Sequence, residues 1–228
     1  MFERVLTIPD PVERKNLVAF LEKAVRLDEA AVVRMRTRTD GRVSVWAATG
    51  FDALAVRVIT GKIVPDDTSA AADQLVNALQ SAFDGVVDPG FSMDSAWRGA
   101  LPPDSGFHHV DDVPARVLID LAQRGAALAK EHGSSHGPPV SLLDQEVLHV
   151  EGSGEDVSIA MRTVFALTAM GFVPHAGVDP LTADVDLSRI DVDELVRVRA
   201  TKVWLRLDGR YGSVFCRRGD PLSLSVER

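Results

Sequence analysis

The sequence predicts an α+β fold of duplicated β-α-β-β-β units, in which mostly antiparallel sheet packs against about four helices. The first observation is a pair of segments, 31–61 and 195–226, in which apolar and polar residues alternate around an Asp-Gly pair. Such a pair between alternating runs is a strong hairpin signal, because a two-residue turn needs positive φ. The second observation is that apolar residues recur at helical spacing outside these segments. The third is that both halves of the chain present their elements in the same order.

In the first half, a short strand over 2–8 is expected to end at Pro9. Asp10 can then cap a helix over 11–25, with Pro11 at the first helical position. A three-strand meander follows and turns at Asp40-Gly41. A second helix is expected over 67–83, where acidic residues in the first turn interact favourably with the helix dipole.

The middle of the chain, 84–111, lacks clear periodicity. Its Trp97 and Phe107 are costly to leave exposed, so this segment is expected to pack against the rest of the fold. Asp112 is predicted to cap a third helix over 114–132, and the 134–139 loop that follows is the best candidate for a boundary.

In the second half, a strand over 147–150 is expected to precede a fourth helix over 155–170, which Gly171 ends. The second meander is expected to place two strands around Asp208-Gly209 and a third after Gly219-Asp220. Aligning the two halves predicts an N-terminal repeat with a helix over 1–88, a connecting segment over 89–140 and a C-terminal repeat over 141–228.

The 228-residue chain has a formal net charge of −8, but this charge is unevenly distributed. Segment 31–60 carries +3 and segment 195–228 carries +5, so the remainder carries −16. This asymmetry predicts that the meanders present basic sheet faces to partners, or to acidic helices of the same chain.

Cys216 is the only cysteine, which excludes an intrachain disulfide and a zinc site of several thiolates. Its place in a predicted strand favours a small buried apolar residue over a nucleophile. The N-terminus has no apolar signal segment, and no apolar run is long enough to span a bilayer. We therefore expect a cytoplasmic protein that does not act at a membrane.

Arginines recur on alternate positions of the predicted strands and so share one sheet face. Guanidinium groups arranged in this way can bind carboxylates or phosphates bidentately. The residues concerned are Arg34, Arg36, Arg38, Arg197, Arg199 and Arg206. They are the predicted partner- or anion-binding residues, although pairing within the chain is the more common role for such residues.

The densest group of possible metal ligands is His108, His109 and Asp111. Imidazole and carboxylate suit several transition metals. Adjacent histidines in extended chain nevertheless point to opposite sides, so the sequence favours neither a metal nor a cofactor here. The Gly152-Ser153-Gly154 run lacks the third glycine of a dinucleotide fingerprint and is interpreted as a tight strand-to-helix turn.

Residue usage is rich in Arg, Ala, Val and Asp, and the central run from Trp97 to Pro103 continues through Gly106-Phe107 to 110–114 (VDDVP). In these features the chain resembles a family of conserved actinobacterial proteins of unknown function. The resemblance carries no catalytic motif, so it implies no active-site residue.

The sequence thus favours a non-catalytic protein that binds a protein or peptide partner and self-associates, with a homodimer as the expected state. One alternative is an enzyme or small-ligand-binding protein with a site near His108, His109 and Asp111. A second alternative is nucleic-acid binding through the arginine faces, which the sequence pI of about 5.2 and the few nearby aromatic residues disfavour.

Overall fold

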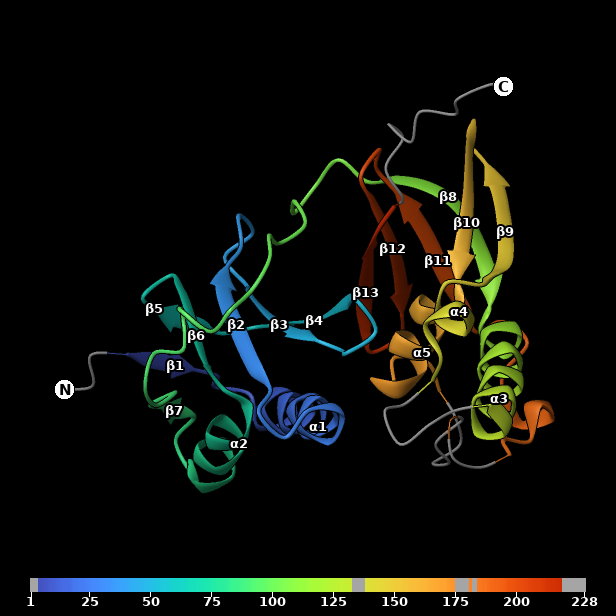
Figure 1. Ribbon diagram of the computed structural model, residues 1–228. Helices are drawn as coiled ribbons and strands as arrows, with labels where there is room; N and C mark the ends of the chain where they lie inside the picture. Colours follow the sequence, from blue (N-terminus) through green and yellow to red (C-terminus); the bar gives the residue numbers. More distant parts are fainter. Residues whose placement is uncertain (1–3, 133–137, 175–180, 182–183, 219–228) are drawn as a thin grey trace.

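The structure is a computed structural model, and it describes residues 4–132, 138–174, 181 and 184–218 (Figure 1). The first half contains β1 (Val5–Thr7), α1 (Pro11–Leu27), β2 (Val32–Thr37), β3 (Val43–Ala48), β4 (Ala53–Ile59), β5 (Lys62–Val64), β6 (Asp67–Ala71), α2 (Ala72–Ser81) and β7 (Val86–Val87). The second half contains β8 (His108–Pro114), α3 (Ala115–His132), α4 (Val140–Leu143), β9 (Glu146–Gly152), β10 (Glu155–Ala160), α5 (Met161–Ala169), a short 3-10 helix (Leu187–Arg189), β11 (Leu195–Ala200), β12 (Trp204–Gly209) and β13 (Gly212–Arg217). We call residues 88–107, which connect the halves, the strap.

One antiparallel sheet of eight strands runs through both halves, in the order β6-β2-β3-β4-β13-β12-β11-β8. Each half contributes a meander and one further edge strand, and the halves meet where β4 pairs with β13. We call this junction the seam. Smaller sheets, β5-β1-β7 and β10-β9, complete the two halves. The chain is therefore α+β, as expected, and mostly antiparallel.

The two halves share a plan, which is consistent with duplicated units. In each half, the strand that extends the meander leads directly into a helix: β6 into α2, and β8 into α3. In each half, a strand from one of the smaller sheets leads through a helix into the meander: β1 through α1, and β10 through α5. In the first half the meander comes before β5, β6 and α2, whereas in the second half it forms the last three described strands.

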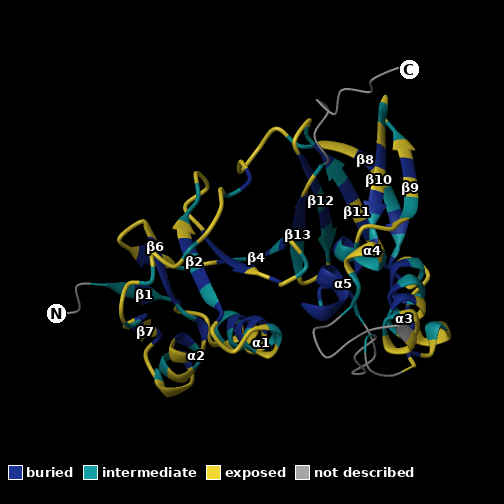
Figure 2. Cartoon of the chain, in the orientation of Figure 1, coloured by how far each residue is buried: buried dark blue, intermediate teal, exposed yellow. Residues whose placement is uncertain are grey.

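The two faces of the large sheet are covered differently. Inward residues such as Val33, Met35 and Val198 are buried in the main core with the helices. On the opposite face a smaller apolar cluster of Trp46, Val56, Trp204 and Phe215 lies across the seam. Figure 2 shows that the strands of the large sheet are mostly buried, that the helices are partly exposed, and that the strap is largely exposed.

The first helix forms as its sequence predicts. The Oδ1 atom of Asp10 accepts a hydrogen bond from the backbone N–H of Val12 at 2.8 Å, and Pro11 is the first helical residue. This cap satisfies one of the N–H groups that a helix start leaves unpaired. Leu17, Phe20 and Leu21 then bury one face of α1.

A strand runs directly into each of three predicted helices; two of these helices, α2 and α5, begin later than expected, whereas α3 begins at Ala115, one residue from its predicted start. Residues 67–71 pair with β2, so α2 begins at Ala72. Residues 108–114 pair with β11, so Asp112 lies in a strand and caps no helix. Residues 155–160 pair with β9, which places Gly152-Ser153-Gly154 in a strand-to-strand turn instead of a strand-to-helix turn. Pairing across the sheet outweighs local helix signals at all three places.

The second meander has a different register from the predicted one. Its first predicted strand is two strands, β11 and β12, separated at Thr201, Lys202 and Val203. The turn between β12 and β13 lies at Arg210 and Tyr211, because Gly209 pairs with Gly212. A Cβ at Gly212 would collide with the Phe172 ring, which explains a glycine at this position. The strand expected after Gly219-Asp220 lies outside the described residues, as does most of the 134–139 loop.

Among the described helices, none combines the length and the apolar character needed to cross a bilayer. The predicted domain limits at residues 88 and 140, and the cytoplasmic location, stay predictions.

Candidate functional site

The seam joins residues far apart in the sequence into one surface. Four consecutive pairs, from Ser213 with Val56 to Cys216 with Ala53, make the sheet continuous across the two halves. On the outer face, the Trp46 and Phe215 ring centroids lie 5.1 Å apart. The strap crosses this face, and its Trp97, Leu101 and Phe107 pack against the same cluster. The expectation that this segment packs down is therefore confirmed.

Two cavities open along the seam. One, of about 380 Å³, is lined by Ala48, Gly50, Asp52, Ala53, Leu54, Arg98, Gly99, Ala100, Trp204, Phe215 and Arg217. The other, of about 820 Å³, is lined by Asp52, Asp144, Glu146, Asp156, Ser158, Ala160, Arg162, Thr163, Leu205, Cys216, Arg217 and Arg218. They share Asp52 and Arg217, but the smaller cavity lies over the outer face of the sheet, whereas the larger one, with Leu205 and Cys216, lies on the core side; we call the two cavities together the seam groove.

The smaller part of the seam groove combines an apolar floor with a basic rim. The half-buried Leu54 and the edges of the buried Trp204 and Phe215 rings, which are 8% and 3% exposed, supply the apolar surface. The Arg217 guanidinium lies 4.9 Å from the Trp204 ring centroid, in cation–π geometry. Both Arg98 and Arg217 are exposed, and within the described part of the chain neither has a carboxylate at ion-pairing distance. Two cations therefore remain available beside an apolar surface.

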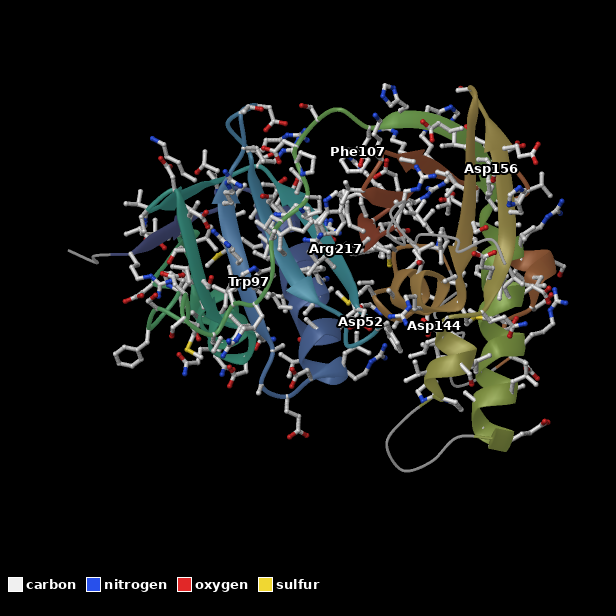
Figure 3. The ribbon with its side chains drawn as sticks, turned by 45° about the horizontal axis from the view of Figure 1, so that its top comes forward. Asp52, Trp97, Phe107, Asp144, Asp156 and Arg217 are labelled. Atoms are coloured by element: carbon white, nitrogen blue, oxygen red, sulfur yellow. The ribbon has the colours of Figure 1, made fainter. Side chains whose placement is uncertain are left out.

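The larger part of the groove is held by an ion-paired arginine. Arg162, at the start of α5, donates to Asp52 of the first half at 2.6 Å and to Asp144 of the second half. Figure 3 shows these two carboxylates close together at the seam. Burial opposes the charge of Arg162, but the hydrogen bonds to Asp144 and Asp52 outweigh this and raise the pKa of its guanidinium. Arg162 thus fastens the two halves together beneath the groove.

Cys216 lies in the wall of the larger cavity and is buried, as the sequence predicts. Burial raises the pKa of its thiol to about 11, although a hydrogen bond from Thr163 Oγ1 at 3.2 Å works in the other direction. A thiol with this pKa stays protonated near neutral pH, so it contributes packing rather than a nucleophile.

The six predicted arginines all lie beside carboxylates of the same chain. In the first half, Arg34 pairs with Asp67 at 2.7 Å, and Arg36 approaches the same carboxyl group at 3.9 Å. Arg38 pairs with Asp40 at 3.3 Å and with Asp104 of the strap at 3.6 Å.

In the second half, Arg199 and Arg206 both pair with Asp208, at 3.4 Å and 2.6 Å. Arg197 lies 3.8 Å from Asp112 and is well exposed. Arg36 and Arg197 are therefore the least engaged members of the set. The structure does not bring the two groups of arginines into one site.

An acidic shell of helices does not cover these arginines, contrary to the sequence-based expectation. The helices pack on the other face of the sheet, and the residues of α1, α2, α3 and α5 carry a net charge of +3, from eight Lys or Arg and five Asp or Glu. The carboxylates that pair with the arginines lie instead on neighbouring strands, turns and the strap. Pairing between adjacent strands is short-ranged, so total charge by segment could not locate it.

The predicted ligand group near His108 is dispersed along β8. His109 Nε2 lies 3.1 Å from Asp112 Oδ1, whereas Asp111 Oδ1 accepts a hydrogen bond from the backbone N–H of Asp112. His108, His109 and Asp111 do not form a three-ligand cluster in the described structure.

Sequence reasoning missed the residues of the seam groove. Arg98, Trp204 and Arg217 were visible as basic and aromatic residues, but their meeting depends on the pairing of β4 with β13. A usable signal was present in β12 and β13, where Trp204, Arg206, Phe215 and Arg217 alternate with buried aliphatic residues. This pattern predicts a second covered face, because a solvated face seldom carries large aromatic residues.

Two family models match the chain. Residues 102–221, more than half of the chain, match the family described as Domain of unknown function (DUF8185). Residues 1–99 match the model described as Domain of unknown function (DUF8010). The division between the two matches falls within the strap. No curated protein matches the chain.

Solved structures with the same fold are DNA polymerase sliding clamps. The clamp from Bacillus subtilis is 12% identical with a TM-score of 0.55, and the match covers 100% of this chain and 68% of that one. A beta subunit of DNA polymerase from Streptococcus pyogenes is 11% identical, with a TM-score of 0.54 and coverages of 95% and 65%. A sliding clamp from Bartonella birtlesii bound to griselimycin is 15% identical, with a TM-score of 0.54 and coverages of 96% and 65%. At these identities the likeness shows the fold alone.

Proposed function

We propose that this chain, which belongs to the DUF8185 family and has a sliding-clamp-like fold, is a non-catalytic binding protein that docks a peptide segment of a partner protein in the seam groove. The observation that carries the proposal is the smaller cavity, in which Leu54, Trp204 and Phe215 lie beside two arginines without carboxylate partners in the described structure. A groove of this kind is the usual form of a recognition site: apolar surface with a few directed polar groups.

The chemistry of the groove defines its occupant. Apolar side chains of the peptide would cover Leu54 and the accessible ring edges of Trp204 and Phe215, and an acidic group would pair with Arg98 or Arg217. Each apolar side chain that is buried contributes ~1.5–3 kcal/mol. A hydrogen bond to a charged group contributes ~1.5–3 kcal/mol. Two apolar anchors and one such bond sum to at most ~9 kcal/mol, and an association cost of at least ~4 kcal/mol limits a short peptide to sub-millimolar affinity at best.

The fold is compatible with this role. Two of the solved structures with this fold are subunits of DNA polymerase, and one of these two is bound to griselimycin. The larger cavity meets the smaller one at Asp52 and Arg217, so a longer peptide would pass around this end of the sheet to reach it. Its mixed lining of carboxylates and arginines would select the polar residues of that extension.

The test is a selection from a displayed library of random hexapeptides against the whole chain. The expected result is enrichment of sequences that combine Leu or Phe with Asp or Glu. Arg217→Glu and Arg98→Glu should each weaken binding of a selected peptide at least tenfold, because a like charge then faces its acidic group. Ala100→Trp should abolish binding by filling the cavity. Thermal unfolding would show that each variant remains folded.

Arg116→Glu is the matched control, since Arg116 is an exposed arginine of α3 that lines neither cavity. It should bind the selected peptide as the unchanged protein does. Enriched peptides whose affinity is the same for Arg217→Glu, Arg98→Glu and Ala100→Trp would contradict the proposal.

Self-association is the second part of the proposal, with the homodimer as the expected state. Arg36 and Arg197 are exposed and only loosely paired, so they are the members of the arginine faces best able to meet carboxylates of a second copy. Replacing both with Glu should shift sedimentation velocity toward the monomer, and the shift should lessen with added salt. Monomer in the unchanged protein at all concentrations tested would refute this part alone.

A further inference from the structure

We propose that His149, Glu151 and Asp156 form a binding site for one divalent transition-metal ion on the β9–β10 hairpin. One ligand atom from each of these residues lies within 4.8 Å of the other two. Among the described residues, this is the only group of three such ligands. It uses none of the residues His108, His109 and Asp111 that the sequence singled out.

The hairpin itself brings these three side chains to one face. His149 and Glu151 are two residues apart on β9, so their side chains point to the same side. Asp156 of β10 is directly opposite Glu151, and Ser158 is opposite His149. Between the strands, Ser153 and Gly154 both have positive φ, at 53° and 79°. Such a two-residue turn fixes the register of the hairpin and hence the spacing of the ligands.

The donor atoms are already at metal-binding distances. His149 Nε2 lies 3.2 Å from Glu151 Oε1 and 3.0 Å from Asp156 Oδ1. Metal–nitrogen and metal–oxygen bonds of about 2.0–2.2 Å place neighbouring ligands of an octahedral ion about 3 Å apart. An ion could therefore be bound with small side-chain adjustments.

Electrostatics favour a cation at this place. Like charges directly opposite on paired strands are unfavourable, and Glu151 faces Asp156 in this way. Within the described structure, the ion-pair partner of both carboxylates is His149, and no Lys or Arg pairs with either. The β9 and β10 strands contain no Lys or Arg at all. A bound divalent ion would remove the repulsion between the two carboxylates.

The ligand set also defines the class of ion. One imidazole nitrogen and two carboxylate oxygens suit Zn²⁺, Mn²⁺, Co²⁺ or Ni²⁺, whereas Ca²⁺ and Mg²⁺ prefer oxygen ligands alone. The three side chains are 53%, 73% and 67% exposed, so the ion would keep water at its remaining positions. We therefore expect reversible, moderate affinity, without a role as a folding nucleus.

The experiment is calorimetric titration of CoCl₂ and ZnCl₂ into the chelator-treated, tag-free full chain, together with NMR line broadening by MnCl₂. One saturable site is expected, and Mn²⁺ should broaden the amide signals of residues 149–158 first. His149→Ala, Glu151→Gln and Asp156→Asn should each lower the affinity at least tenfold. These positions are exposed, and circular dichroism would show that the variants keep their structure.

His109→Ala is the matched control, because His109 also lies beside a carboxylate, that of Asp112, but has no third ligand. It should bind metal as the unchanged protein does. The site would be overturned by the lack of saturable binding, by equal affinity in His149→Ala, or by broadening centred on His109. Metal binding is measured without any peptide, so its outcome is independent of the seam-groove proposal.

Discussion

The backbone N–H and C=O groups of the large sheet have different partners at the seam and at the two outer edges. At the seam the partner is another strand, whereas at the edges it is not. At the seam, β4 and β13 pair with each other through main-chain hydrogen bonds. At the β6 edge, the Ser69 carbonyl accepts from Met93 N–H of the strap, and the Ser69 N–H donates to Asp94 Oδ1 at 2.6 Å. The strap thus covers this edge with one backbone and one side-chain contact.

The β8 edge is blocked by other means. Pro114 has no N–H to offer, and the N–H of Asp112 donates to its neighbour Asp111. The β9 strand approaches so closely that a Cβ at Gly152 would collide with the Val110 carbonyl oxygen. Open edges invite pairing with other chains, and all of these devices are ways of preventing it.

The large sheet is therefore closed to further strands at both of its outer edges. A partner cannot easily extend it at β6 or β8, so recognition has to use side chains rather than strand addition. The seam is the place where side chains from both halves meet around a depression. A partner that binds through side chains would therefore meet both halves of the chain at the seam.

The largest expected effect comes from opening the β8 edge with Gly152→Ala. The added Cβ would push β9 away from Val110, at a cost of about 2–3 kcal/mol by analogy with overpacked cores. Denaturant unfolding measures this cost, and light scattering should show increased association through the uncovered edge. Gly154→Ala is the control, because its Cβ meets nothing within 4 Å and only its φ of 79° is unfavourable. Equal losses in the two variants would argue against the close β9–β8 approach.

A smaller effect is expected at the seam from Arg162→Ala. The change removes the link between Asp52 and Asp144 but leaves both carboxylates accessible to water, so the expected loss is about 1–2 kcal/mol. Urea unfolding provides the measurement. Arg124→Ala, which breaks an exposed pair with Asp120 within α3, should cost no more than about 0.5 kcal/mol. If both variants lose the same stability, Arg162 does not fasten the halves.

The smallest effect is expected at the β6 edge from Asp94→Asn, and it should depend on pH. Burial opposes the charge of Asp94, but hydrogen bonds from Ser92 and Ser69 lower the pKa of its carboxyl group. A folded-state pKa below the unfolded one stabilises the fold above the unfolded pKa, and this contribution is lost as pH falls through the folded pKa. The stability difference between the two proteins, measured by urea unfolding, should therefore shrink as the pH is lowered below about 4. A difference that is constant from pH 7 to pH 3 would contradict this assignment.

The sequence was sufficient where local chemistry decides the structure. Asp10 and Pro11 specify the start of α1, and the alternation around Asp40-Gly41 specifies the first hairpin. The aromatic residues of the strap were enough to predict that it packs against the fold. Cys216 was correctly placed in a buried strand, because a small apolar side chain fits the inner face of the sheet.

Long-range pairing was the part that the sequence could not provide. Segments 67–71, 108–114 and 155–160 run into helices without an intervening loop, so their strand character depends on partners elsewhere in the chain. The seam groove depends on contacts such as Phe215 with Leu54, which are far apart in the sequence. The His149 group was missed because it requires the register of β9 against β10, and the sequence analysis placed a helix at β10.

The path of the strap has a consequence for how the chain could be divided. It leaves the first half at β7, crosses the outer face of the seam and enters the second half at β8 (Figure 1). A break near Gly99 would separate two polypeptides: the first keeps α1 and α2 and leaves β4 without its partner strand β13, and the second keeps α3, α4 and α5 and leaves β13 without its partner strand β4. Produced as separate fragments, these two pieces should recognise each other and rebuild the native protein, which would make the chain a natural candidate for a split reporter.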